Sequence, residues 1–136
     1  MNIQVKYLPQ HNRITLNNFL FPKVQDGAND LKFPWEKNVR LPRTILPLHY
    51  DLYLHPDLET GLFSGKVAIE VDNEMPTDHF LVHTKYLDIQ SWKVRKNGLE
   101  QIITEAFEYK PNEFFVIKMA NNLTEGKYVI DLGKFI

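Results

Sequence analysis

The chain has 136 residues, of which 43% are apolar and 24% charged, and its formal net charge is −1. This length suits one domain with a buried core, and a charge near zero gives no long-range attraction to nucleic acid or to anionic lipid. The absence of cysteine excludes a disulfide framework, a thiolate nucleophile and a cysteine zinc site.

The first 32 residues carry only weak strand-like patches, at 3–8 and 14–20, separated by polar turn residues. We expect residues 1–32 to be an irregular and poorly ordered lead-in, followed by one β domain over residues 33–136. No signal-peptide core and no run of about 20 apolar residues is present, so we expect no membrane span in this chain. These observations leave its compartment open.

Two long strands are predicted after a proline-rich segment. Prolines between Pro34 and Pro47 favour an extended path along the surface. From 48 to 55, apolar and polar residues alternate strictly, which predicts a half-buried strand with leucines and Tyr50 on one face. After turn signals, residues 63–71 alternate in the same way and predict a second strand at hairpin distance.

Further short strands are expected downstream, beginning with one at 79–83. The apolar phase shifts within 87–96, which a bulge or a bend would explain. Asn97-Gly98 is a strong signal for a type I′ hairpin turn, and it predicts that the chain returns through a strand at 99–104.

The stretch 113–119 is apolar on both faces and predicts a central strand that is covered on both sides. A turn is expected at 121–126, and the alternation of Tyr128, Ile130 and Leu132 predicts the last strand. Strands at intervals of about 8–14 residues without an amphipathic helix indicate an all-β fold, either an antiparallel β-sandwich or a saddle-shaped sheet.

The pattern most similar to a metal-binding motif is the pair His79 and His83, which have the spacing of the histidines in an H-E-x-x-H zinc motif. Phe80 replaces the glutamate, however, and the flanking pattern is that of a strand. Four residues of strand span about 13 Å, too far for two imidazoles to share one ion. We therefore expect no catalytic residue, no metal ligand and no substrate-binding residue in the chain.

Three other features have a functional and a structural interpretation. His49 and His55 share a strand face with Asp51, but about 20 Å of strand separates the two histidines, so a solvated face is favoured. No G-x-S-x-G elbow and no glycine-rich phosphate loop occurs. The aromatic residues Phe33, Trp35, Phe114 and Phe115 are more typical of a core than of a binding surface.

Asn122-Leu123-Thr124 is a glycosylation acceptor pattern in a predicted turn. Its use depends on entry of the chain into the secretory pathway. Asn122 is therefore a candidate glycosylation site.

The opening of the β domain resembles a known family. The run F-P-W-x(4)-R-L-P-x(4)-P-x-H-Y-D-L-x-L-x-P-x-L, followed by F-x-G-x-V-x-I-x-V, covers residues 33–71. It is similar to the start of the N-terminal β domain of zinc aminopeptidases of the aminopeptidase N type, and the similarity extends more weakly to residue 132.

The resemblance implies a non-catalytic domain that precedes and packs against a thermolysin-like catalytic domain. In that family, the G-x-M-E-N motif, the zinc motif and the catalytic tyrosine all lie later, so no functional residue is carried over. The implied cofactor is zinc in a missing catalytic domain, and the chain is expected to be a C-terminally incomplete fragment or truncated product. Family members occur at the plasma membrane, outside the cell, in the endoplasmic reticulum lumen or in the cytosol.

Two interpretations remain open. In the first, the chain is a piece of a zinc aminopeptidase and is inert alone; in the second, it is a free-standing β-sandwich interaction module. Separation from a catalytic domain would expose apolar surface, so self-association is expected. An autonomous enzyme would have to hold stoichiometric zinc and hydrolyse aminoacyl amides.

Overall fold

The computed structural model describes residues 32–136, so the expected lead-in, apart from its last residue, lies outside the described part. Eight strands form two antiparallel sheets, and the only helical element among these residues is a short 3₁₀ turn at Lys110–Asn112. The strands are β1 (Ile45–Pro56), β2 (Phe63–Asn73), β3 (Thr77–His83), β4 (Ile89–Lys96), β5 (Leu99–Glu100), β6 (Ile103–Tyr109), β7 (Phe114–Leu123) and β8 (Gly126–Phe135). The predicted all-β sandwich is confirmed.

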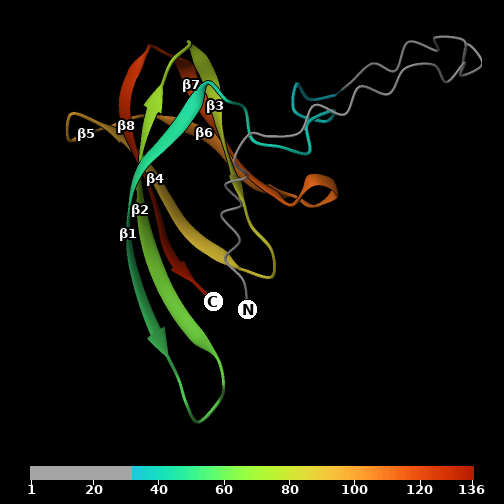
Figure 1. Cartoon of the computed structure of the whole chain (residues 1–136), viewed down its shortest axis with the longest axis vertical. Coiled ribbons are helices and arrows are strands. Elements are labelled where there is room, and N and C mark those ends of the chain that lie inside the picture. Colours follow the sequence, from blue (N-terminus) through green and yellow to red (C-terminus); the bar gives the residue numbers. More distant parts are fainter. Residues whose placement is uncertain (1–31) are drawn as a thin grey trace, which may run out of the picture.

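The strand order is β1-β2-β8-β4-β5 in one sheet and β3-β7-β6 in the other (Figure 1). The main core lies between the sheets, where Phe80 and Ile117 of the smaller sheet meet Ile69, Val94 and Ile130 of the larger one. All five side chains are almost completely buried. Across residues 32–136, no helix is long and apolar enough to cross a membrane.

Strand β7 is central, as predicted, and its two faces enter different clusters. Phe115 and Ile117 face the main core, whereas Phe114 and Val116 belong to a second cluster that also contains Trp35. Trp35 is 2% exposed and stacks on Phe33, with 4.9 Å between the ring centroids. The F-P-W segment therefore covers the outer face of the smaller sheet, and the core interpretation of these aromatics is confirmed.

The loop that contains Trp35 is fixed by one side chain that the sequence did not single out. The Asn112 amide donates to the backbone oxygens of Trp35 at 3.2 Å, Glu36 at 3.3 Å and Asn38 at 2.8 Å. Its two N–H groups thus satisfy carbonyls that no regular ladder pairs. Asn112 anchors the F-P-W segment to the start of β7.

The predicted hairpins are present, with two differences from expectation. The turn at Asn97-Gly98 has positive φ at both residues, 51° and 77°, as a type I′ turn requires. The returning strand ends after two residues, however, and the chain moves to the smaller sheet as β6. β7 also runs to Leu123, so Asn121 and Asn122 lie at the end of a strand and only 124–125 form the turn.

The phase shift expected within 87–96 has a different origin from a bulge in that strand. The register of β4 against β8 runs without a shift from Ile89 to Arg95. The irregularity lies in β8, where Lys134 has a φ of 48° and the pairing with β2 shifts. This change of phase brings Phe135 into the core together with Ile89.

Gly65 of the F-x-G motif is required by close packing. A Cβ at this position would lie 2.6 Å from the Tyr53 carbonyl oxygen and 2.6 Å from the Phe135 ring. The carbonyl belongs to the paired strand β1 and cannot rotate away. Glycine therefore lets β1, β2 and the end of β8 meet at this point.

We predict that Gly65→Ala lowers the free energy of unfolding by roughly 1–3 kcal/mol, because the added methyl group must displace backbone or the Phe135 ring. Urea unfolding followed by circular dichroism measures this change. Ser64→Ala, at the neighbouring position on the opposite face, is the control and should change stability by less than about 0.5 kcal/mol. Equal effects of the two substitutions would contradict this account of the motif.

We predict that Asn112→Asp loosens the F-P-W segment, because a carboxylate offers no donor to the three carbonyls and repels them. The expected loss of stability is about 1–3 kcal/mol, with faster amide hydrogen exchange over residues 33–38. Asn97→Asp makes the same chemical change in an exposed turn that accepts either residue, and it should leave exchange at 33–38 unaltered. Unchanged exchange in Asn112→Asp would refute the anchoring role.

Candidate functional site

A row of exposed apolar side chains on the core-facing side of the larger sheet lies along β1. Tyr50, Leu52 and Leu54 share one face of this strand, and their pairing partners in β2 are Ile69, Val67 and Gly65. Their exposed fractions are 38%, 48% and 44%. We call Tyr50, Leu52 and Leu54 the apolar strip.

The apolar strip is uncovered because the two sheets differ in extent. The β1–β2 hairpin runs well past the smaller sheet in Figure 1, so β3, β6 and β7 cover only its upper part. β1 is also an edge strand, and residues 46–56 are all exposed. The alternation predicted for this strand is confirmed from His49 onward, but the expected half-burial is wrong. A bulge at Leu48 moves that residue out of the predicted phase.

The opposite face of β1 is a solvated polar face, as the favoured interpretation predicted. His49, Asp51 and His55 are exposed, and their partners in β2 are Glu70, Ala68 and Ser64. The two histidines lie six positions apart along one strand. No group of three or more histidine, aspartate or glutamate side chains within residues 32–136 is arranged to hold a metal ion.

His79 and His83 lie on β3 and are each packed against an aromatic ring. The His79 ring is 4.9 Å from Trp35, and the His83 ring is 4.7 Å from Phe114, centroid to centroid. A nitrogen of His79 lies 2.6 Å from the Asp78 carboxylate, and this contact lowers the pKa of Asp78. The strand spacing keeps the two imidazoles from sharing an ion.

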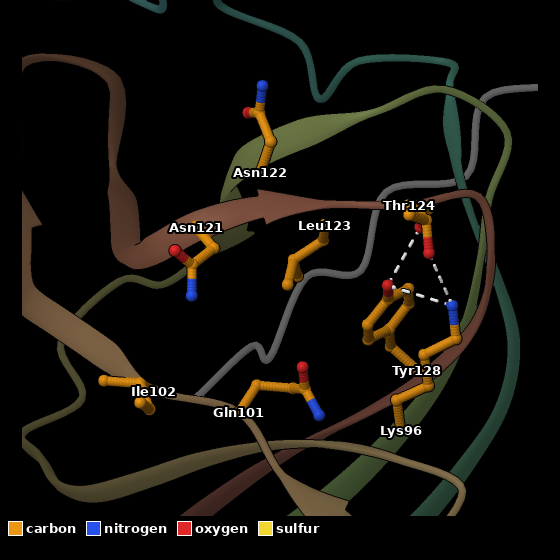
Figure 2. Close-up of a pocket in the computed structure, with 8 residues that line it drawn as sticks. All are labelled: Lys96, Gln101, Ile102, Asn121, Asn122, Leu123, Thr124 and Tyr128. Atoms are coloured by element: carbon orange, nitrogen blue, oxygen red, sulfur yellow. Dashed lines mark hydrogen bonds between the residues drawn. The ribbon is translucent and has the colours of Figure 1, made fainter.

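A small hollow of about 200 Å³ lies at the turn between β7 and β8 (Figure 2). The Lys96 ammonium donates to Thr124 Oγ1 at 2.8 Å, the Glu125 carbonyl at 3.1 Å and the Tyr128 hydroxyl at 3.2 Å. It also lies 4.8 Å from the centroid of the Tyr128 ring.

The hollow has a structural role because its one cation is fully engaged. An ammonium has three donors, and all three are used within the turn. The Tyr128 hydroxyl in turn donates to the Thr124 carbonyl at 2.9 Å, and Asn73 Nδ2 donates to the same oxygen at 3.2 Å. Lys96 therefore closes the β7–β8 turn, and it offers no donor to a ligand.

A second hollow lies between the edge strands β5 and β6, near Trp92 and Ile102. Its two carboxylates are already paired: Glu100 with Lys93 at 3.2 Å, and Glu105 with Lys118 at 3.5 Å. Neither hollow presents a nucleophile with a neighbouring base, so the apolar strip is the strongest candidate functional surface.

Asn122, the candidate glycosylation residue, is exposed at the rim of the hollow between β7 and β8. Figure 2 shows its amide pointing away from Gln101, whereas Asn121 extends from the other side of the strand.

Comparison with known proteins gives a consistent family. The model of the peptidase M1 N-terminal domain matches residues 46–132. Endoplasmic reticulum aminopeptidase 1 of Rattus norvegicus is 36% identical over 109 residues, which are 77% of this chain and 11% of that protein. Glutamyl aminopeptidase of Homo sapiens is 32% identical over 123 residues, which are 82% of this chain and 13% of that protein.

The chain thus spans about a tenth of the length of the curated relatives that it matches. The matched region contains all eight strands except the terminal residues of β1 and β8. It also contains the apolar strip and most of the motif that suggested zinc aminopeptidases. The resemblance is confirmed: the chain belongs to the peptidase M1 family and corresponds to the N-terminal domain of that family.

Proposed function

We propose that this chain is the non-catalytic N-terminal β domain of a zinc aminopeptidase, an enzyme that removes N-terminal amino acids from peptides. The family match over residues 46–132 and the relatives named as aminopeptidases support the parent activity. In this proposal the zinc ion and the catalytic groups belong to a separate catalytic domain. The contribution of the chain is structural.

The observation that carries the proposal is the uncovered apolar strip. Tyr50, Leu52 and Leu54 lie on the face that elsewhere packs against the smaller sheet, so a partner placed here would extend an existing core. The three side chains remain 38–48% exposed, and covering that surface is worth on the order of 1 kcal/mol per residue. The partner that fits is the catalytic domain of the same enzyme.

Partial burial already affects the chemistry of this face. Desolvation raises the pKa of the Tyr50 hydroxyl above its ordinary value, because partial burial disfavours the charged phenolate. A phenol that lies beside Leu52 on the same strand face suits an interface that is apolar with one polar contact. The acidic and basic side chains of β1 and β2 lie on the opposite face, where water solvates them.

For location, we propose a lumenal or extracellular environment. This proposal is supported by the relatives named endoplasmic reticulum aminopeptidase in Rattus norvegicus and Homo sapiens. It implies that the domain folds where oligosaccharide transfer takes place.

We predict that the purified 136-residue chain self-associates through the apolar strip. Sedimentation velocity should show concentration-dependent species larger than the monomer. The double substitution Leu52→Lys and Leu54→Lys should shift the population toward monomer, because charged side chains resist desolvation. His55→Lys, which adds charge to the opposite face, is the control and should not dissociate the species. A monodisperse monomer for the unaltered chain would contradict this prediction.

The parent enzyme is tested by the mass of the endogenous polypeptide, captured with an antibody raised against residues 33–71. We expect a species far heavier than the 16.0 kDa of this chain, with peptides that contain an H-E-x-x-H segment. A species of 16.0 kDa without such peptides would overturn the proposal. That result would favour the alternative, a free-standing β-sandwich module that binds another protein through the same strip.

A further inference from the structure

The sequence contains one N-x-S/T triplet, Asn122-Leu123-Thr124, and its placement in the fold meets the needs of an N-linked glycan. The triplet spans the end of β7 and the first residue of the turn into β8. A glycan requires an acceptor amide that faces solvent after folding, because the attached sugar is bulky and hydrated.

The Asn122 side chain meets that requirement. Asn122 is exposed, and none of the hydrogen bonds among residues 32–136 involves its amide. Figure 2 shows the amide pointing away from Gln101 and Tyr128. The adjacent residues have opposite environments: Leu123 is 6% exposed and belongs to the main core.

The remainder of the triplet is fixed without use of the Asn122 amide. Thr124 Oγ1 accepts from Lys96 at 2.8 Å, and the Thr124 carbonyl accepts from Tyr128 and from Asn73. The turn is therefore held by its own contacts, and a sugar on Asn122 would displace none of them.

The position is also compatible with the proposed docking of a catalytic domain. In Figure 1 the turn between β7 and β8 is at the upper end of the sandwich, whereas the uncovered part of the β1–β2 hairpin is at the lower end. A glycan on Asn122 would leave the apolar strip accessible.

We propose that Asn122 carries an N-linked oligosaccharide. The donor is a lipid-diphosphate-linked oligosaccharide. A bond forms between Asn122 Nδ2 and the anomeric carbon of the first sugar, the anomeric C–O bond to the diphosphate breaks, the amide loses one proton and the lipid diphosphate leaves. No oxidation or reduction occurs. The inference rests on the proposed lumenal location, and it is independent of the zinc enzyme itself.

The experiment is cell-free translation of the full chain behind a cleavable secretory signal, in the presence of microsomes that supply donor and transferase. Only protease-protected molecules are scored, so every counted chain has entered the lumen. We expect one electrophoretic shift that peptide N-glycosidase reverses. Asn122→Gln should abolish the shift, whereas Asn121→Gln and Thr124→Ser, which keep the triplet functional, should preserve it.

A control variant shows that an exposed turn of this chain can be modified. Leu99→Thr creates a second triplet at Asn97, in the exposed turn between β4 and β5. It should add a second shift to the first. Protected chains in which only Asn97 is modified, or in which none is modified, would overturn the proposal.

A second measurement tests the statement that the fold presents this residue. The glycosylated chain and its enzymatically deglycosylated form should show the same melting temperature within a few degrees. A large loss of stability with the sugar attached would mean that Asn122 is not presented to solvent by the folded domain, and the structural basis of the inference would be wrong.

Discussion

The burial of β7 on both faces is the constraint on which the rest of the domain depends. Phe115 and Ile117 on one face hold the larger sheet, while Phe114 and Val116 on the other face hold Trp35 of the F-P-W segment. Complete burial of one large side chain is worth about 1.5–3 kcal/mol, so a strand with apolar residues on both faces joins three layers that would not otherwise adhere. The three layers are the F-P-W segment, the smaller sheet and the larger sheet. The F-P-W segment is thus part of the packed domain, although it precedes the first strand.

The second consequence of this arrangement is unequal coverage of the larger sheet. The smaller sheet has three strands, two of which have only 7 residues, whereas β1 has 12 and β2 has 11, so it does not cover the far end of the β1–β2 hairpin. An exposed edge strand that carries leucines is unfavourable for a solitary domain, since water contacts apolar surface and unpaired backbone groups. In the function proposed above, a neighbouring catalytic domain removes that disadvantage by covering the apolar strip.

Sequence patterns predicted the structure well where the polarity of a strand's two faces or the backbone demands of a turn determine it locally. The Asn97-Gly98 turn and the doubly apolar β7 are examples, since each depends on local chemistry alone. The exposure of Tyr50, Leu52 and Leu54 was not predictable in this way: alternation reports which face is apolar, but the extent of the opposing sheet decides whether that face is covered. The shift in the pairing of β8 with β2 was likewise not predictable, because the positive φ of Lys134 has no signal in its residue type.

The polar contacts were the least visible in the sequence, and they give the two ends of the domain different properties. Asn112 and Lys96 are ordinary surface residue types, yet each satisfies three acceptors that come from distant segments or from a turn. Lys96 thereby holds the β7–β8 turn in place. The neighbouring side-chain amide of Asn122 is not needed for this and can face solvent. At the opposite end, Asp57 Oδ1 accepts from the backbone N–H groups of Glu59 at 2.9 Å and Thr60 at 3.3 Å and holds the turn of the hairpin, while the adjoining strand presents the apolar strip. The domain thus separates a hydrated end, suited to a sugar, from an apolar end, suited to another protein domain.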